Sequence, residues 1–206
     1  MQITDSLNLA LSFGDGLTAF HIPVDRAVYE ANYAVINATK AALSRKGIHY
    51  QMGSGPRIAN LVLKDEGLKD AAERDSVDAK GNAVDERTPA LLEEIKRLTT
   101  ILAPGANGYE NLPVDVAIAQ GKMDAEDWSE LEASIVFFMC HVMPAKKANR
   151  ASIAKATASV ISGSIESSPI TAFSASLQTL MKVELSQSLA SSPQPSDTPV
   201  VTGLPI

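Results

Sequence analysis

The chain has 206 residues, 45% of them hydrophobic and 20% charged, which is typical of a globular protein with one domain plus appendages. Its net charge of −6 argues against a nucleic-acid-binding surface, which needs clustered Lys and Arg; the densest basic group is only Lys146, Lys147 and Arg150. No apolar run approaches the roughly 20 residues of a transmembrane helix, so we expect neither nucleic-acid nor membrane binding.

The N-terminal residues predict a β-hairpin. Apolar and polar side chains alternate over residues 3–13, the segment Gly14-Asp15-Gly16 interrupts the alternation, and residues 17–24 resume extended character. Two such runs around a glycine-rich turn are typical of paired antiparallel strands.

A long helix is predicted directly after the hairpin, from Asp25 to about Arg45. Asp25 suits the N-cap and Gly47 suits the position just past the C-terminus. Tyr29 and Tyr33 are one helical turn apart and should share a face, which makes them candidate partner-binding residues.

Three further helical segments are predicted between residues 56 and 121, separated by loops. Pro56 suits the first turn of a helix that continues to about Asp75, and residues 73–87 form a charged loop. A helix opened by Thr88-Pro89 is predicted to run to Pro104, and a short one is predicted between Pro113 and Gly121. The apolar stripe of the helix before Pro104 consists of Leu91, Ile95, Leu98 and Leu102.

The strongest helix signal begins at Asp124, where acidic side chains meet the positive end of the helix dipole. Its C-terminal half is apolar almost all round until Pro144, so this half either is deeply buried or meets another chain. The candidate partner-binding residues on this helix are Trp128, Phe137, Phe138 and Val142.

Beyond residue 148 the composition changes. Residues 149–190 predict a weakly helical, Ala/Ser-rich extension, with apolar residues recurring at Phe173, Leu177, Leu180 and Leu185. Residues 191–206 are rich in Ser and Pro and predict a flexible tail. With residues 1–148 as the hairpin and helical domain, the predicted fold class is mainly α with an N-terminal β-hairpin (α+β).

Catalytic, cofactor and metal sites are not predicted. His21, His49 and His141 are far apart and lack metal-ligand spacing to each other or to the one cysteine, Cys140, which is expected to be a small buried hydrophobe in a protein of a reducing cytoplasm. Ser152-x-x-Lys155 matches a serine acyl-enzyme pattern, but the accompanying motifs are missing, so an exposed helical Ser and Lys is the preferred interpretation.

Two other polar groups also favour structural interpretations. Residues 53–57, Gly-Ser-Gly-Pro-Arg, lack the G-K-[ST] of a phosphate-binding loop. The carboxylates after residue 123 are best explained by helix capping rather than by acid–base catalysis or cation binding. These carboxylates are Asp124, Glu126, Asp127 and Glu130.

The opening segment resembles the tail assembly chaperones of long-tailed bacteriophages. The resemblance lies in Phe-Gly-Asp-Gly at 13–16, in His-Ile-Pro-Val at 21–24 and in the helix start at 25–33; residues 55–59 and 128–138 are also similar to phage proteins. It implies a mainly helical, non-enzymatic protein of the infected host's cytoplasm. Such a protein binds the tape measure protein, a long apolar helical client, during tail assembly.

Other functions stay open at this point. A structural virion protein (tail, connector or capsid-associated) retained in the mature particle is the main alternative, because a low-complexity tail that orders on assembly suits it. An unrelated bacterial interaction domain and an enzyme are the remaining hypotheses. The expected partners are the tape measure or other phage tail proteins, with a homo-oligomer as a further alternative.

Overall fold

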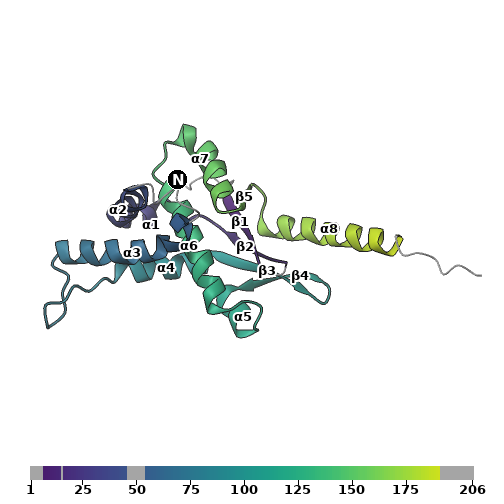
Figure 1. Cartoon of the computed structure of the whole chain (residues 1–206), viewed down its shortest axis with the longest axis horizontal. Helices are drawn as coiled ribbons and strands as arrows, with labels where there is room; N and C mark the ends of the chain where they lie inside the picture. Colours follow the sequence, from purple (N-terminus) through teal and green to yellow (C-terminus); the bar gives the residue numbers. More distant parts are fainter. Residues whose placement is uncertain (1–6, 15, 46–53, 191–206) are drawn as a thin grey trace, which may run out of the picture.

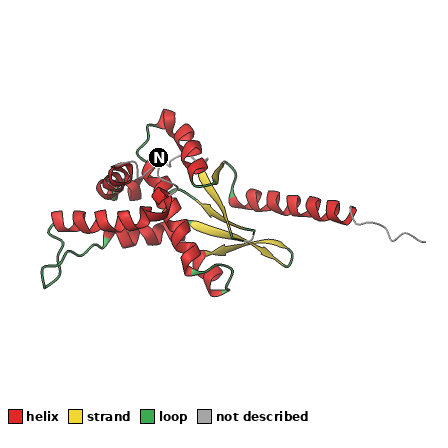
Figure 2. Cartoon of the chain, in the orientation of Figure 1, coloured by secondary structure: helices red, strands yellow, loops and turns green. Residues whose placement is uncertain are grey.

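The computed structural model describes residues 7–14, 16–45 and 54–190 and contains a five-stranded antiparallel sheet with helices on both faces (Figures 1 and 2). The strand order is β4-β3-β2-β1-β5. The strands are β1 (Asn8–Phe13), β2 (Leu17–His21), β3 (Thr99–Gly105), β4 (Gly108–Pro113) and β5 (Gly163–Glu166). The helices are α1 (Arg26–Ala31), α2 (Tyr33–Ser44), α3 (Ser54–Glu73), α4 (Arg87–Arg97), α5 (Val114–Ala119), α6 (Ala125–Val142), α7 (Lys147–Val160) and α8 (Ile170–Ala190). The predicted fold class is confirmed.

The N-terminal hairpin is formed by β1 and β2, as the alternation predicts. Leu9 faces His21 and Phe13 faces Leu17 across the pair. The turn places Gly14 at φ +50° and Gly16 at φ +78°, and glycine adopts this left-handed region without the steric cost of a Cβ atom.

The register divides the sheet into two faces. Leu9, Ala19 and Ile101 lie on the face that packs against α6, and all three are buried in the main hydrophobic core. Phe20 and Leu102 point the other way and are also buried, and α8 begins on that face beside β4 and Phe20. The ring centroids of Phe20 and Phe173 of α8 are 5.4 Å apart. The sheet is therefore covered on both sides, which explains why β2 is buried along its whole length.

The predicted helix from Asp25 to Arg45 is wrong in one respect, since the structure divides it at Asn32. Asp25 caps α1 as expected, with its Oδ1 accepting from the amide of Val28 at 2.9 Å. Asn32 leaves the helical conformation (φ −111°, ψ 15°), and its side-chain amide donates to the carbonyl of Val28. An asparagine side chain that bonds the preceding turn competes with helical hydrogen bonding, and α2 restarts immediately afterwards.

The predicted helix from Thr88 to Pro104 is also wrong beyond Arg97. α4 ends there, and Thr99–Gly105 is β3, which pairs with β2. The apolar spacing of Leu98 and Leu102 continues the helical period by coincidence, whereas the β-branched run Thr99-Thr100-Ile101 favours a strand. β4 and β5 are likewise strands that the sequence analysis did not predict.

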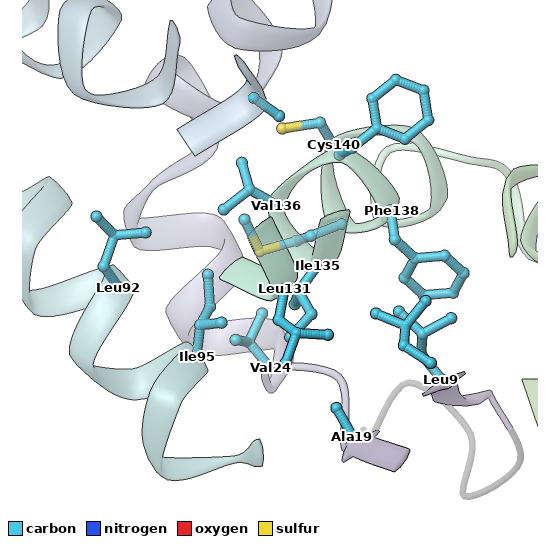
Figure 3. Close-up of a cluster of buried hydrophobic side chains, with 14 of the residues drawn as sticks. Leu9, Ala19, Val24, Leu92, Ile95, Leu131, Ile135, Val136, Phe138 and Cys140 are labelled. Atoms are coloured by element: carbon cyan, nitrogen blue, oxygen red, sulfur yellow. The ribbon is translucent and has the colours of Figure 1, made fainter. Parts of the chain in front are cut away.

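The central helix α6 begins and ends where predicted. Asp124 and Asp127 form a reciprocal capping box, each side chain accepting from the other's backbone amide. The helix then crosses the sheet and supplies much of the core (Figure 3). Its buried Glu132 accepts a hydrogen bond from the Asn60 amide at 3.0 Å, which ties α6 to α3.

The predicted boundary at residue 148 falls inside α7, and the segment that follows is part of the same sheet. β5 pairs with β1 through Asn8↔Glu166 and Leu11↔Gly163, so the C-terminal extension adds the strand next to β1 at one edge of the sheet. α8 starts against the sheet and then extends away from the body of the molecule (Figure 1). The predicted tail at 191–206 and His49 lie outside the described residues.

Candidate interaction surfaces

The candidate partner-binding residues of α6 are mostly inside the chain. Phe137, Phe138 and Val142 are at most 2% exposed and belong to the hydrophobic core, whereas Trp128 is half-buried against it. A side chain at this depth is not available to a partner in this conformation. Of the two alternatives for this apolar helix end, the structure shows intrachain burial, and these three residues are corrected from interface to core.

Tyr29 and Tyr33 lie on the surface, with their rings in an edge-to-face arrangement 5.9 Å apart. Tyr33 is 57% exposed, and burial raises the pKa of the half-buried Tyr29 hydroxyl. Both tyrosines follow the helical spacing that the sequence analysis used, although Asn32 places them on different helices.

A groove of about 440 Å³ lies between α1 and α4. Its lining includes the apolar side chains of Val28, Ala31 and Leu91 and the charged side chains of Arg87 and Glu94. Val28 is the neighbour of Tyr29 in sequence, so one member of the tyrosine pair lies on the same helix as this groove.

α8 presents a group of exposed apolar side chains. Phe173 and Leu177 are half-buried near the sheet, whereas Leu180, Met181 and Val183 are exposed, with Leu180 at 59%. The apolar repeat of this segment predicted a weak helix from the sequence but no interaction. The apolar spacing shows that one side of the helix needs a partner. It does not show that the sheet covers only the first turns of α8 and leaves the later apolar side chains exposed.

The histidine on β2, which the sequence offered as a possible metal ligand, forms hydrogen bonds within the fold. His21 is buried on β2, and its Nδ1 lies 2.9 Å from Thr99 Oγ1, which donates to the Ile95 carbonyl. Because the threonine has a single proton, the histidine Nδ1 carries the proton in this chain of bonds. Burial lowers the pKa of His21 from 6.5 to about 3, so the ring is neutral. His21 also lines a cavity of about 10 Å³ among apolar residues of α6, enough for one water at most.

Cys140 is buried, as predicted, and burial raises the pKa of its thiol to about 12. Ser152 and Lys155 are both exposed on α7, and the serine hydroxyl donates to the carbonyl of Asn149. Across residues 7–14, 16–45 and 54–190, no three His, Cys, Asp or Glu side chains come together to hold a metal ion.

The comparisons with known proteins add no relative. No protein-family model, curated protein or solved structure matches the chain. None of the helices in the described part of the chain has the length and apolar character needed to cross a membrane.

Proposed function

We propose that this protein is a bacteriophage tail assembly chaperone that binds the tape measure protein without catalysing a reaction. The proposal starts from the resemblance of residues 13–33 to that family. The observation that carries it is the exposed apolar part of α8, in which Leu180, Met181 and Val183 project beyond the sheet.

An apolar side chain on a projecting helix gains most from burial against another apolar helix. Each such contact removes apolar surface from water, which stabilises the complex by about 25 cal/mol per Å² of buried apolar surface. A long apolar helical client offers a repeating surface of this kind, and pairing of amphipathic helices is a common recognition mode. The net charge of −6 keeps copies of the chaperone apart and favours basic stretches of the client.

Quantitative mass spectrometry of purified particles and of the lysate that produced them tests the role in assembly. A chaperone is abundant in the lysate and missing from finished particles. A stoichiometric amount in the particles would overturn the proposal in favour of a structural virion protein.

Co-purification with the tape measure protein tests the surface. The double variant Leu180→Ser/Met181→Ser should lose the client, because two exposed apolar contacts are removed without disturbing the core. Thr171→Ala/Thr179→Ala changes two exposed polar positions on the same helix and serves as the matched control. Equal recovery of the client by both variants would contradict α8 as the binding element.

A further inference from the structure

Positive charge is segregated in the part of this acidic chain that contains α7. Between Glu132 and Glu166 the sequence has four cationic residues, Lys146, Lys147, Arg150 and Lys155, and no Asp or Glu. The first turn of α7 also has no acidic side chain, whereas that of α6 has Glu126 and Asp127. The positive end of the α7 dipole is therefore reinforced by cations instead of being offset by carboxylates.

Three of these cations line one groove. Lys147, Arg150 and Lys155 lie along α7, and the opposite wall is formed by Leu7, Ile165 and Ser167, with a volume of about 470 Å³. Leu7 directly precedes β1, and Ile165 lies on β5 opposite Leu9, so the wall opposite the cations is mainly apolar. From Lys147 to Lys155 the cations span roughly 12 Å along the helix axis, at about 1.5 Å per residue.

These cations have no carboxylate partner among the residues that the structure describes. Elsewhere in the chain, Arg26, Arg57 and Lys69 each pair with a carboxylate, whereas Lys80 and Lys182, like the groove cations, have no ion pair among the described residues. Arg150 donates from Nη2 to the carbonyl of Ala145 at 3.1 Å, and this bond holds the guanidinium in place. Its Nε is buried and has no hydrogen-bond partner in the described structure, which leaves a donor unsatisfied beside the groove.

We infer that this α7 groove binds a short acidic peptide segment of a partner protein. Carboxylates would pair with Lys147, Arg150 and Lys155, and an apolar side chain between them would pack against Leu7 and Ile165. The groove favours a peptide over a nucleic acid for two reasons. Two of the three residues across from the cations, Leu7 and Ile165, are apolar. A long polyanion extending past about 12 Å of cations would also meet a protein of net charge −6, which repels it. This inference does not depend on the proposed function.

Fluorescence anisotropy of the full chain with a rhodamine-labelled peptide, Glu-Leu-Glu-Ile-Glu, tests the inference. The matched probe Gln-Leu-Gln-Ile-Gln has the same apolar side chains without the charges. We expect saturable binding of the acidic peptide that weakens at least tenfold between 50 and 300 mM salt, and at least tenfold weaker binding of the glutamine peptide.

The variant Lys147→Glu/Lys155→Glu should reduce the affinity for the acidic peptide at least tenfold. Both side chains are exposed, so the fold should survive, and circular dichroism melting checks this. Lys80→Glu/Lys182→Glu makes the same change in net charge at exposed lysines outside the groove and should bind like the wild type. An equal loss in both variants would overturn the inference, as would no saturation by 1 mM peptide. Tighter binding of a ten-nucleotide oligothymidine that competes with the peptide would also overturn it, in favour of nucleic acid.

Discussion

His21 shows how one buried polar side chain links the hairpin to α4. Its ring donates to Thr99 at the start of β3, and Thr99 in turn donates to Ile95 in the last part of α4. The three groups satisfy one another in an apolar surrounding, where an unpaired donor would cost about 1–3 kcal/mol. The arrangement requires a neutral imidazole. Protonation would bury a positive charge, and this chain of hydrogen bonds contains no carboxylate that could compensate it.

The stability of the protein should therefore fall as the pH drops below the ordinary pKa of histidine. His21 binds a proton in the unfolded chain below pH 6.5 but in the folded chain only below about pH 3. Its contribution is fully present above pH 6.5 and is lost as pH falls toward 3, at about 1.4 kcal/mol per unit. Between pH 7 and pH 5, the free energy of unfolding measured in urea should fall by about 2 kcal/mol more in the wild type than in a variant without His21.

The control for this prediction is His21→Gln, which keeps a hydrogen-bonding side chain but does not titrate. His49 and His141 are present in both proteins, so their contributions cancel in the comparison. The same pH dependence in wild type and variant would show that His21 is not the group responsible.

Between elements, the contact of α3 with α4 depends on a residue without a side chain. A Cβ atom at Gly67 of α3 would lie 2.1 Å from both Asp85 Oδ2 and Thr88 Oγ1, which is far inside van der Waals contact. Glu86 is the N-cap of α4 and forms no side-chain capping bond; the Oδ1 of Asp85, one residue earlier, instead accepts from the amides of Arg87 and Thr88. Asp85, and not Thr88 at the predicted start of the helix, therefore satisfies the first free amides of α4, and α3 passes close to it.

Gly67→Ala should destabilise the protein, although alanine in an ordinary helix position is more favourable than glycine by about 1 kcal/mol. The reason is the close approach of the Asp85 and Thr88 side chains. Thermal unfolding measures the effect, with Gly67→Ala in a Thr88→Ala background as the control. The destabilisation by Gly67→Ala should be smaller in that background, and strict additivity of the two substitutions would argue against the contact.

The apolar end of α6 allows a second prediction at this scale. Phe138→Asp should abolish cooperative folding, because losing a buried Phe costs about 3–5 kcal/mol before the cost of burying a charge is added. Leu61 of α3 is 61% exposed, and Leu61→Asp should change the free energy of unfolding by no more than about 0.5 kcal/mol. Near-wild-type urea unfolding of Phe138→Asp would mean that this helix end is not core.

These elements also show what the sequence could predict. Period-2 alternation and a Gly turn were enough for the hairpin, and Asp124 with Asp127 was enough for the start of α6, because both signals are local. The sequence did not predict the break between α4 and β3, because Leu98 and Leu102 continue the helical spacing across it. The strand conformation of residues 99–105 depends on pairing with β2, which is not a local signal. Periodicity identified Phe138 as apolar-facing but could not say whether its neighbour belonged to this chain or to another.

For the whole molecule, α8 is the element whose removal is most informative. Its first turns lie on the face of the sheet away from α6, where Phe173 contacts Phe20. A chain truncated after residue 168 should lose about 2–3 kcal/mol of stability, since fully burying one large apolar side chain contributes about that much. Truncation after residue 190 keeps α8 and should leave the melting temperature nearly unchanged.

Thermal unfolding of the two truncated chains separates the outcomes. A large drop on removing residues 191–206 alone would mean that this segment docks on the folded body, against the prediction from its Ser/Pro-rich composition. No change on removing residues 169–206 would mean that the second face of the sheet does not need α8.

The pairing of β1 with β5 has a consequence for how the chain folds as it leaves the ribosome. β1 and β2 emerge early, but the strand that closes the outer edge of β1 is Gly163–Glu166. At about 5–20 residues per second, synthesis of the intervening segment takes on the order of 10–30 s. During that interval the outer edge of β1 has unpaired backbone groups, and such an edge can pair with another chain. The nascent chain is thus most exposed to capture by another nascent copy, or by a host folding factor, before its last strand is made.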